Sequence, residues 1–348
     1  MKLIHVGLGN WGMDWERNAL PPVADLVERV AIVEAYEPAL EKAQRALELP
    51  DAACFTTLDQ ALDATDAELV LVTAPMVAHV PVAIQALEAG RHVLVEKPFA
   101  GSLDEAQHAV AVAERTGRTL MVSQNYRFYP APRTAARLVA ERELGDPGSV
   151  SVDFRRWAND AEYEMNRHYQ FPHPLLFDMA IHHYDLMRMV LGQEAVEVYA
   201  KDTSPSWSRF DEEAEALLII TFANGQTLSY RGSWVSSGEP TNWAGEWRME
   251  FAEGEIQWTS RAGGDVGAGG DVVHVRRRGA RPVKVPLDEL PLLGRSMGLK
   301  HLVECIARGE EPECSGRRNL ATVAIMEAAV RSAGSGKVEP VAQIAYTR

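Results

Sequence analysis

The sequence predicts an α/β protein in which a doubly wound parallel sheet is followed by an α+β domain with a large, mostly antiparallel open sheet. Up to residue 125, short runs of Val, Ile and Leu alternate with helical periodicity, which is typical of strands buried on both faces and their crossover helices. From residue 126, apolar and polar residues alternate with the period of strands that have one solvated face. The 348 residues therefore divide into a domain of residues 1–125 and a domain of residues 126–348.

Five apolar runs predict the strands of the first domain: Leu3–Val6, Val30–Val33, Leu69–Thr73, His92–Val95 and Leu120–Ser123. Helical periodicity predicts helices at Pro81–Ala89 and Ser102–Thr116, and Ser102 with Glu105 has the spacing of a capping box.

Six segments of period two predict the strands of the second domain: Ser149–Arg155, Ala195–Ala200, Ala214–Phe222, Gln226–Trp234, Trp247–Phe251 and Asp271–Arg276. Asn224-Gly225 separates two of them and is a hairpin turn signal. The glycine-rich residues 263–270 predict a mobile loop. Helices are expected at Leu175–Leu191, Met297–Arg308 and Asn319–Ser332.

Charge and composition narrow the classes of function. The 49 acidic and 35 basic residues give a net charge of −14, which disfavours nucleic acid and anionic membranes as partners. No apolar run approaches the roughly 18 residues of a membrane-spanning helix, and the amino terminus enters a strand-like run without a signal peptide. The three cysteines, Cys54, Cys305 and Cys314, lack metal-binding spacing, so we expect reduced thiols in a cytoplasmic protein.

A glycine-rich turn follows the first predicted strand, with the sequence Gly7-Leu8-Gly9-Asn10-Trp11-Gly12. Gly7 allows the tight turn, Gly9 lets the backbone approach a pyrophosphate, and Gly12 permits close packing of helix on strand. The helix after it would direct its amino terminus at the phosphates. A simple glycine turn is the alternative, but the position after the first strand of an alternating unit favours a dinucleotide.

A second motif, Glu96-Lys97-Pro98, directly follows the predicted strand His92–Val95. Open α/β sheets bind ligands at the carboxyl ends of their strands. Proline ends the strand and stiffens the turn, which would hold the lysine at a fixed point over the sheet edge. A surface salt pair before a helix is the alternative interpretation.

A third motif places Asp178 and His182 four residues apart on a predicted helix, so that they share one face. An imidazole and a carboxylate that face one cleft can transfer protons. Satisfied polar groups on a half-buried helix are one alternative, and a metal site that adds His168 and His173 is another. The residues lack a tight spacing such as HExxH, and we expect no metal.

These motifs, taken in order, resemble the Gfo/Idh/MocA family of glucose–fructose oxidoreductase and inositol dehydrogenase. The resemblance implies an NAD(P)-binding Rossmann domain at residues 1–125 and a substrate-binding and oligomerisation domain at residues 126–348. The closing helices, separated by Ser315-Gly316, extend it over nearly the whole chain. It is carried by Gly7–Gly12, Ala74–His79, Glu96–Pro98 and Asp178-x-x-x-His182-x-x-Asp185.

The resemblance also implies roles for individual residues. Lys97 matches the family's catalytic lysine, His182 its catalytic histidine, and Asp178 the carboxylate that orients the reacting hydroxyl. Tyr126 and Arg127, where the chain enters the second domain, would bind substrate hydroxyls or form a domain-interface hydrogen bond. The expected substrate-binding residues are Lys97, Tyr126, Arg127, Asp178 and His182. The expected cofactor-binding residues are Gly7, Gly9, Asn10, Trp11, Gly12, Glu34, Ala35, Tyr36, Thr73, Ala74, Pro75, His79, Glu96 and Lys97.

Two features depart from the family's pattern. Phe171–Pro174 stands where members often have glycines, so the cleft wall is expected to be bulkier. Ala35 aligns with the acid that members using NAD commonly carry. The usual spacing of about 20 residues beyond the glycine turn reaches both Glu34 and Glu37 without selecting either. Because Ala35 and Tyr36 supply no cation for a 2′-phosphate, we expect NAD as cofactor, with NADP not excluded.

The expected function is an NAD(P)-dependent oxidoreductase that transfers a hydride between nicotinamide and a secondary hydroxyl of a sugar, polyol or inositol-like substrate. Lys97 is the first candidate for the base, because desolvation and the oxidised nicotinamide lower a lysine's pKa, and His182 is the competing base. The alternatives are a glycosidase that oxidises its substrate transiently and a non-catalytic sensor of dinucleotide or sugar. A broad free sheet face predicts a homodimer or homotetramer through the second sheet.

Overall fold

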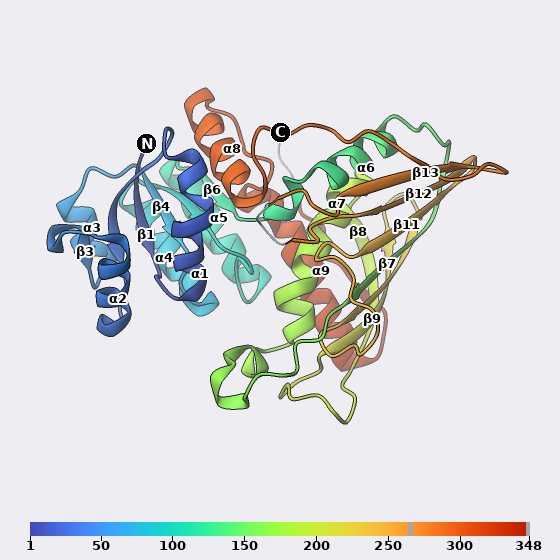
Figure 1. Ribbon diagram of the computed structural model, residues 1–348, viewed down its shortest axis with the longest axis horizontal. Helices are drawn as coiled ribbons and strands as arrows, with labels where there is room; N and C mark the ends of the chain where they lie inside the picture. The colour runs from blue at the N-terminus through green and yellow to red at the C-terminus, as the bar shows by residue number, and fades with distance from the viewer. Residues whose placement is uncertain (264–266, 346–348) are drawn as a thin grey trace. The chain divides into compact units, whose positions relative to one another are not determined.

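The computed structural model describes residues 1–263 and 267–345 and divides into two compact units (Figure 1). The first unit comprises Met1–Asn125 and Gly294–Leu320, and the second comprises Tyr126–Leu293 and the chain from Ala321 onwards. The predicted division, which assigned everything after residue 125 to the second domain, is therefore corrected. The segment Gly294–Leu320 packs with the first unit because Val122 N–H, on the edge strand of the first sheet, donates to Cys314 O.

The first unit is built on a parallel sheet of six strands in the order β3-β2-β1-β4-β5-β6, with helices on both faces (Figure 1). The strands are β1 (Lys2–Val6), β2 (Glu28–Val33), β3 (Cys54–Phe55), β4 (Leu69–Val72), β5 (His92–Val95) and β6 (Leu120–Val122). The five predicted strands are confirmed within two residues. Strand β3 was missed because two residues are too short to show a period.

The helices of the first unit are α1 (Asn10–Asp14), α2 (Glu37–Leu47), α3 (Leu58–Ala64), α4 (Met76–Glu88), α5 (Leu103–Thr116) and α8 (Gly294–Arg308). Ser102 caps α5 as predicted, because its Oγ accepts the Glu105 N–H. The Glu105 carboxylate accepts the Gly101 N–H instead of the Ser102 N–H, so only half of the predicted capping box forms. Helix α4 begins five residues before its predicted start because Pro81 lies inside the helix instead of opening it.

The second unit contains a nine-stranded sheet in the order β14-β13-β12-β11-β7-β10-β9-β8-β15. Among the described strands of this second sheet, only β7 and β10 pair in parallel. The prediction of a mostly antiparallel sheet is therefore confirmed. The six predicted strands correspond to β7 (Pro147–Arg155), β8 (Ala195–Thr203), β9 (Glu215–Phe222), β10 (Thr227–Ser233), β11 (Glu246–Phe251) and β13 (Val272–Arg277).

Three further strands of this sheet were missed: β12 (Gly254–Thr259), β14 (Val283–Lys284) and β15 (Glu339–Pro340). Strand β12 buries adjacent residues, including the charged Glu255, so its sequence lacks clean alternation. The predicted hairpin turn between β9 and β10 is confirmed, since Gly225 adopts a φ of +83° and donates its N–H to Phe222 O. The predicted loop at residues 263–270 lies partly outside the described residues.

Helices cover one face of this sheet: α6 (Pro130–Ala140), α7 (Ala180–Leu191) and, from Ala321 on, α9 (Gly316–Ser335). Helix α9 is joined to β8 by the Ala200 N–H, which donates to Ser332 Oγ. The predicted helix Leu175–Leu191 is divided, because residues Pro174–Met179 form a π-helical segment before α7 begins. Asp178 therefore lies just before the α-helix that carries His182.

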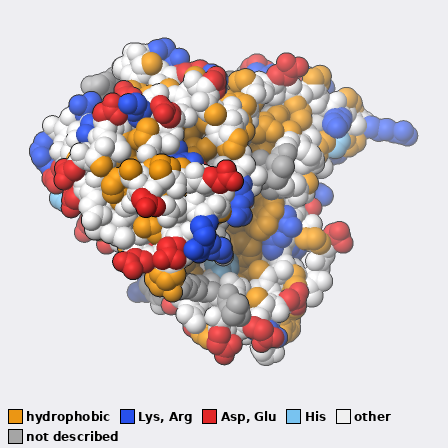
Figure 2. Space-filling model, turned by 60° about the vertical axis from the view of Figure 1, so that its left-hand side comes forward, with side chains coloured by type: hydrophobic (Ala, Val, Ile, Leu, Met, Phe, Trp, Pro, Cys, Tyr) orange, Lys and Arg blue, Asp and Glu red, His pale blue; other side chains and the backbone are white. Residues whose placement is uncertain are grey.

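The surface of the described chain mixes both signs of charge. On the face shown in Figure 2, acidic and basic side chains are interspersed, with hydrophobic side chains scattered among them. No helix among the described residues is both long and apolar enough to cross a membrane.

Candidate active site

The glycine-rich turn lies at the carboxyl end of β1, and its three glycines have different tasks. A Cβ at Gly7, whose φ is +94°, would lie 2.4 Å from Ala74 N, and a Cβ at Gly12 would lie 1.9 Å from Gly7 O. Both positions therefore exclude any side chain. Gly9 has no atom within 4 Å of its Cβ position. The turn is closed on its protein side and open at Gly9, which fits the close approach of a cofactor phosphate.

A buried polar chain supports this turn. Thr73 Oγ1 donates to Gly7 O at 2.5 Å, so it accepts from His5 Nε2 at 2.9 Å. His5 Nδ1 in turn lies 2.7 Å from Glu16, which also pairs with Arg29. Burial alone would raise the pKa of Glu16, but its hydrogen bonds and charge interactions with His5 and Arg29 hold that pKa below its ordinary value. Thr73, expected to bind the cofactor, thus fixes the backbone that would bind it.

Glu34 is the acid that the structure brings to the turn. Its carboxylate accepts the Leu8 N–H at 2.8 Å and the Tyr36 N–H at 3.1 Å. Glu37, which the sequence spacing could not separate from Glu34, instead begins α2. Tyr36 is exposed, and Ala35 lies between Glu34 and Tyr36 in the sequence.

A cavity of about 350 Å³ adjoins the turn and brings two cations that the sequence did not place there. Arg17 comes from the π-helical turn after α1, and Lys42 comes from α2. Both lie outside the segment beside Glu34 in which sequence reasoning looked for a cation. The cavity is lined by Leu8, Gly9, Asn10, Met13, Arg17, Ala39, Lys42, Ala43 and Ala46.

Two other residues that were expected to bind the cofactor also lie at this edge of the sheet. Trp11 is 42% exposed, and the Arg295 guanidinium lies 4.3 Å from the centroid of its ring. Pro75 is the residue from which α4 begins.

His79 joins the turn after β4 to the turn after β5. Its Nδ1 lies 2.7 Å from Pro98 O and its Nε2 lies 2.8 Å from Ala74 O. Burial lowers the pKa of His79 below its ordinary value, although the two carbonyls oppose that shift. Both ring nitrogens are used inside the unit, so the contribution of His79 is to position the turn that carries Lys97.

Glu96 and Lys97 diverge at the end of β5. The Glu96 carboxylate is buried and accepts both the Trp15 Nε1–H at 2.8 Å and the Lys97 N–H at 3.2 Å. Lys97 is half-buried and its peptide bond to Pro98 is cis. Because β1, β4 and β5 are parallel neighbours, the glycine turn, Ala74 and Lys97 share one edge of the sheet. Open α/β sheets bind ligands at this edge.

In the second unit, Asp178 and His182 have separate partners. Asp178 accepts a hydrogen bond from His168 Nε2 at 2.9 Å. The buried His182 ring stacks on Tyr126, with centroids 3.9 Å apart and ring planes 6° apart. Sequence analysis proposed His168 only as a possible metal ligand. No spacing rule connects His168 with Asp178, which lies ten residues after it.

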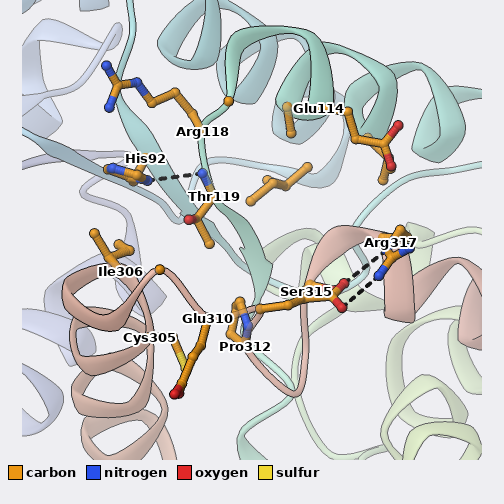
Figure 3. A pocket seen from close by; sticks show the side chains of 16 residues that line it. His92, Glu114, Arg118, Thr119, Cys305, Ile306, Glu310, Pro312, Ser315 and Arg317 are labelled. Atoms are coloured by element: carbon orange, nitrogen blue, oxygen red, sulfur yellow. Dashed lines mark hydrogen bonds and ion pairs between the residues drawn. The ribbon is translucent and has the colours of Figure 1, made fainter. Parts of the chain in front are cut away.

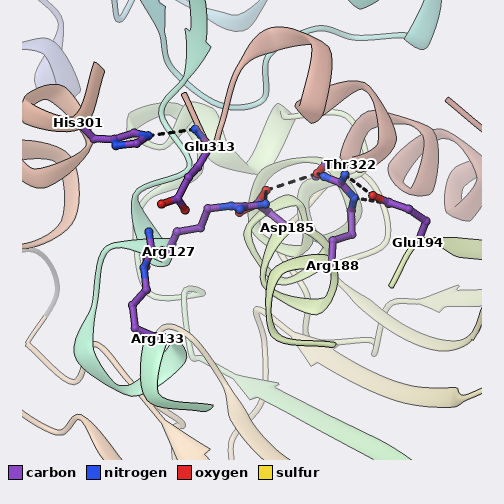
Figure 4. A network of polar contacts seen from close by, with 8 residues as sticks. All are labelled: Arg127, Arg133, Asp185, Arg188, Glu194, His301, Glu313 and Thr322. Carbon is purple, nitrogen blue, oxygen red and sulfur yellow. Dashed lines mark hydrogen bonds and ion pairs between the residues drawn. The ribbon is translucent and has the colours of Figure 1, made fainter. Parts of the chain in front are cut away.

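Tyr126 and Arg127 are neighbours in sequence with different environments. Tyr126 contacts His182, whereas Arg127 forms a buried two-point ion pair with Asp185, with 2.8 Å between Nη2 and Oδ1 (Figure 4). Thr322 donates to the same carboxylate and accepts from Arg188. Arg127 was expected to bind substrate, but its guanidinium is committed to α7. Tyr126 is the better candidate for a substrate contact.

The histidines of the alternative metal interpretation are held apart by other partners. His168 binds Asp178 and His182 stacks on Tyr126, while His173 lies 3.4 Å from Glu212. Within residues 1–263 and 267–345, no group of three His, Cys, Asp or Glu side chains has a geometry that could hold a metal ion.

His183, next to His182, is a structural residue. Its Nε2–H donates to Trp243 O at 3.1 Å and its Nδ1 accepts from the Tyr230 hydroxyl at 2.9 Å. Complete burial lowers the pKa of His183 to about 4, so the ring is neutral near pH 7. It therefore links α7 to β10 and to the loop that carries Trp243.

Another cavity of the first unit, about 410 Å³, lies at the opposite edge of the parallel sheet (Figure 3). His92 and Thr119, at the amino ends of β5 and β6, line it together with Cys305 from α8. The Arg317–Glu311 ion pair also borders it. Ligands of open α/β sheets bind at the carboxyl ends of the strands, so the glycine-turn edge remains the cofactor candidate.

Two family models match the chain. One is described as an oxidoreductase family with an NAD-binding Rossmann fold and matches residues 1–124. The other is the GFO/IDH/MocA C-terminal domain and matches residues 133–255. The matches cover the glycine turn and Lys97 in the first, and Asp178 and His182 in the second.

Individual proteins resemble the chain over most of its length. The uncharacterized protein y4oX of Sinorhizobium fredii is 30% identical over 260 residues, which are 73% of this chain and 71% of the relative. A D-apiose dehydrogenase of Paraburkholderia graminis is 28% identical over 342 residues, covering 93% of this chain and 86% of that enzyme. The structure of aldose-aldose oxidoreductase from Caulobacter crescentus, complexed with glycerol, has a TM-score of 0.82 at 24% identity over 98% of this chain and 99% of that chain. This last likeness confirms the fold.

Replacing His183 tests its neutral, buried state. The pKa of about 4 in the folded protein lies below the ordinary 6.5, so the unfolded chain binds the proton first as the pH falls. Stability is therefore lost from about pH 6.5 down to about pH 4, by about 2 kcal/mol at pH 5. Between pH 7.5 and pH 5, the free energy of unfolding should fall less in His183→Gln than in the unsubstituted protein. Parallel pH profiles would contradict this account.

Proposed function

Because the chain belongs to the GFO/IDH/MocA family and is an NAD(P)-dependent oxidoreductase, we propose that its substrate is a sugar, a polyol or an inositol-like alcohol that reacts at a secondary hydroxyl. The observation that carries the proposal is the shared sheet edge, where Lys97 follows β5 beside the glycine turn after β1. One of its relatives is a D-apiose dehydrogenase, and this supports the substrate class because apiose is a sugar.

The residues of the first unit would hold the cofactor. The open backbone at Gly9 would receive the pyrophosphate, and Glu34 would stand near the adenosine ribose, where an acid binds the 2′-hydroxyl. When bound, the nicotinamide cofactor supplies the hydride acceptor for the carbon that bears the reacting hydroxyl. Thr73 and His79 hold the backbone of this site from behind.

We infer that Lys97 removes the hydroxyl proton as the alcohol is oxidised, and that the protonated Lys97 returns this proton to the same oxygen in the reverse direction. His182 is the second proton-transfer group, and Tyr126 stacking fixes the plane of its ring. Asp178, oriented by His168, accepts a hydrogen bond from a substrate hydroxyl.

A panel of sugars, polyols and inositols, scanned for formation of NADH and NADPH, tests the function directly. Reduced nicotinamide that appears with one of these alcohols supports the proposal. Release of a coloured leaving group from a glycoside without net NADH would indicate the transient-oxidation glycosidase instead. Binding of NAD and sugar without turnover would indicate a sensor.

Lys97→Ala should lower turnover by at least about two orders of magnitude, since general acid–base groups typically contribute that much. NAD affinity, measured by calorimetry, should change much less because the glycine turn makes those contacts. Lys284→Ala, at an exposed position on β14, is the matched control and should keep full activity. His182→Ala should also lower turnover. Near-normal turnover of Lys97→Ala on the true substrate would contradict the assignment.

We propose NAD as the preferred cofactor because the Glu34 carboxylate would repel a 2′-phosphate. Glu34→Gln keeps an oxygen that can accept a backbone N–H but removes the charge. It should raise kcat/KM with NADP relative to NAD by roughly tenfold, as removal of one like-charge contact near the surface predicts. Lys42→Ala in that background should reduce the gain, since Lys42 is one of the two cations, with Arg17, that line the adjoining cavity. A higher kcat/KM with NADP in the unsubstituted protein would refute the preference.

We also propose that the chain self-associates through the outer face of the nine-stranded sheet. Leu217 and Ile219 on β9 are 58% and 54% exposed, and a cavity of about 770 Å³ adjoins them. Cys54 and Cys305 carry free thiols, the state expected in a reducing compartment, which supports a cytoplasmic location.

Sedimentation should show a species heavier than the 38.4 kDa chain. Leu217→Asp combined with Ile219→Asp should convert it to the monomer, because charges on both partners would oppose the packing of the sheets. Val77→Asp, at an 82% exposed position on α4, is the control and should leave the assembly intact. A purely monomeric unsubstituted protein would exclude this interface.

A further inference from the structure

Two arginines of the second unit, Arg156 and Arg261, are linked through Trp243: Arg156 stacks on its ring, and the Trp243 backbone N–H donates to Arg261 O. The Arg261 guanidinium lies 3.8 Å from the Tyr126 ring centroid, and His182 stacks on the same ring at 3.9 Å. Two groups so close to one ring must occupy its opposite faces. One aromatic ring therefore separates Arg261 from the candidate catalytic histidine.

The backbone of each arginine is fixed. Arg156 directly follows β7, where its N–H donates to Ser233 O and its carbonyl accepts the Ser236 N–H. Arg261 follows β12 with a left-handed φ of +66°, and its N–H donates to the buried Asp271 carboxylate. A residue other than glycine in this region costs about 1–3 kcal/mol and is often found at ligand clamps.

Aromatic rings cover the flat faces of both guanidinium groups. Arg156 lies 4.3 Å from the centroid of Trp243, and Arg261 lies on Tyr126. A stacked guanidinium keeps its N–H groups at the edge of the plane, where they can form a two-point hydrogen bond with a carboxylate or a phosphate. Stacking therefore fixes the direction in which these donors point.

Arg156 also differs from its neighbours in its charge environment. Arg155 pairs with Glu246 and Arg231 pairs with Asp153, whereas no carboxylate of the described chain forms an ion pair with Arg156. Its buried Nε has no hydrogen-bond partner among those residues. Burial lowers the pKa of Arg156, and the like charge of Arg261 lowers it further against the opposing effect of Tyr126. A half-buried cation held beside a second cation is costly unless an anion joins them.

We propose that Arg156 and Arg261 bind an anionic group of the substrate, a carboxylate or a phosphate, so that the enzyme acts on an acidic sugar or polyol rather than on a neutral one. This inference rests on the proposed function and names its substrate class. The anion would anchor the substrate beside Tyr126 and orient its hydroxyl toward His182. Arg156 is half-buried and is the more exposed member of the pair, since Arg261 is buried.

Matched pairs of substrates test the proposal. Glucuronate against glucose and galacturonate against galactose compare carboxylates with neutral sugars, and glucose 6-phosphate examines the phosphate. We expect kcat/KM for the acidic members to exceed that for the neutral members at least tenfold. Equal or better use of the neutral sugars would overturn the proposal, and the phosphate arm identifies which anion is preferred.

Arg156→Gln should reduce this preference, measured as the ratio of kcat/KM for the acidic to the neutral member of each pair, roughly tenfold to a hundredfold, the worth of a charge-assisted hydrogen bond. Arg156→Lys should retain part of the preference. Arg155→Gln is the matched control on the neighbouring residue, whose cation is paired with Glu246, and should keep the preference intact. If Arg156→Gln folds, as judged by its melting temperature, and keeps the full preference, the assignment fails.

Calorimetry separates this inference from the proposed function. Glucuronate should bind the unsubstituted protein more tightly than glucose even if no nicotinamide is reduced, and its affinity should fall with rising ionic strength. Binding without turnover would refute the oxidoreductase proposal and support the anion site. Turnover of neutral sugars without any preference for acidic sugars would support the oxidoreductase proposal and refute the anion site. If Arg156→Gln does not fold, the salt dependence and Arg156→Lys still decide the matter.

Discussion

One buried side chain, His79, fixes the edge of the first sheet at which the glycine turn and Lys97 lie. Its two ring nitrogens lie within hydrogen-bond distance of Ala74 O, after β4, and Pro98 O, after β5. Ala74 also packs so closely on Gly7 that no side chain fits there. His79 therefore fixes the positions of the glycine turn and the Lys97 turn relative to each other. Three adjacent strands can place a phosphate site and a lysine reproducibly only because their following turns are joined in this way.

The second unit solves a similar problem with stacking and a buried ion pair. Tyr126 lies between His182 and Arg261, so its ring sets the position of a candidate base and of a cation together. Arg127, the next residue, binds Asp185 on the helix that carries His182. Breaking such a buried pair leaves an uncompensated charge and typically costs about 3–5 kcal/mol. The ion pair therefore fixes α7, the helix on which His182 lies.

The sequence could predict those parts of the site that follow directly from a strand or a helix. Gly7 and Lys97 stand in short motifs directly after a strand, whereas Asp178 lies in a π-helical segment ahead of the helix that carries His182. Arg156 and Arg261 belong to no motif: each follows a strand, and only the pairing of β7, β11 and β12 brings the ends of those strands together. The packing of Gly294–Leu320 with the first unit was missed for the same reason, since periodicity identifies a helix but not its neighbour.

A pair of stacked arginines is also consistent with the charge of the whole chain. The net charge of −14 repels anions at long range, so the chain as a whole offers an acidic substrate no attraction. Salt screens exposed charges beyond about 8 Å at physiological ionic strength, so the few groups nearest the ligand decide its binding. At that range Arg261 stands one aromatic ring away from His182, and Arg156 stacks on Trp243, whose backbone N–H donates to Arg261 O. Recognition of an anion by this chain would therefore depend on the groups nearest the ligand. It would determine the orientation of the substrate more than its association rate.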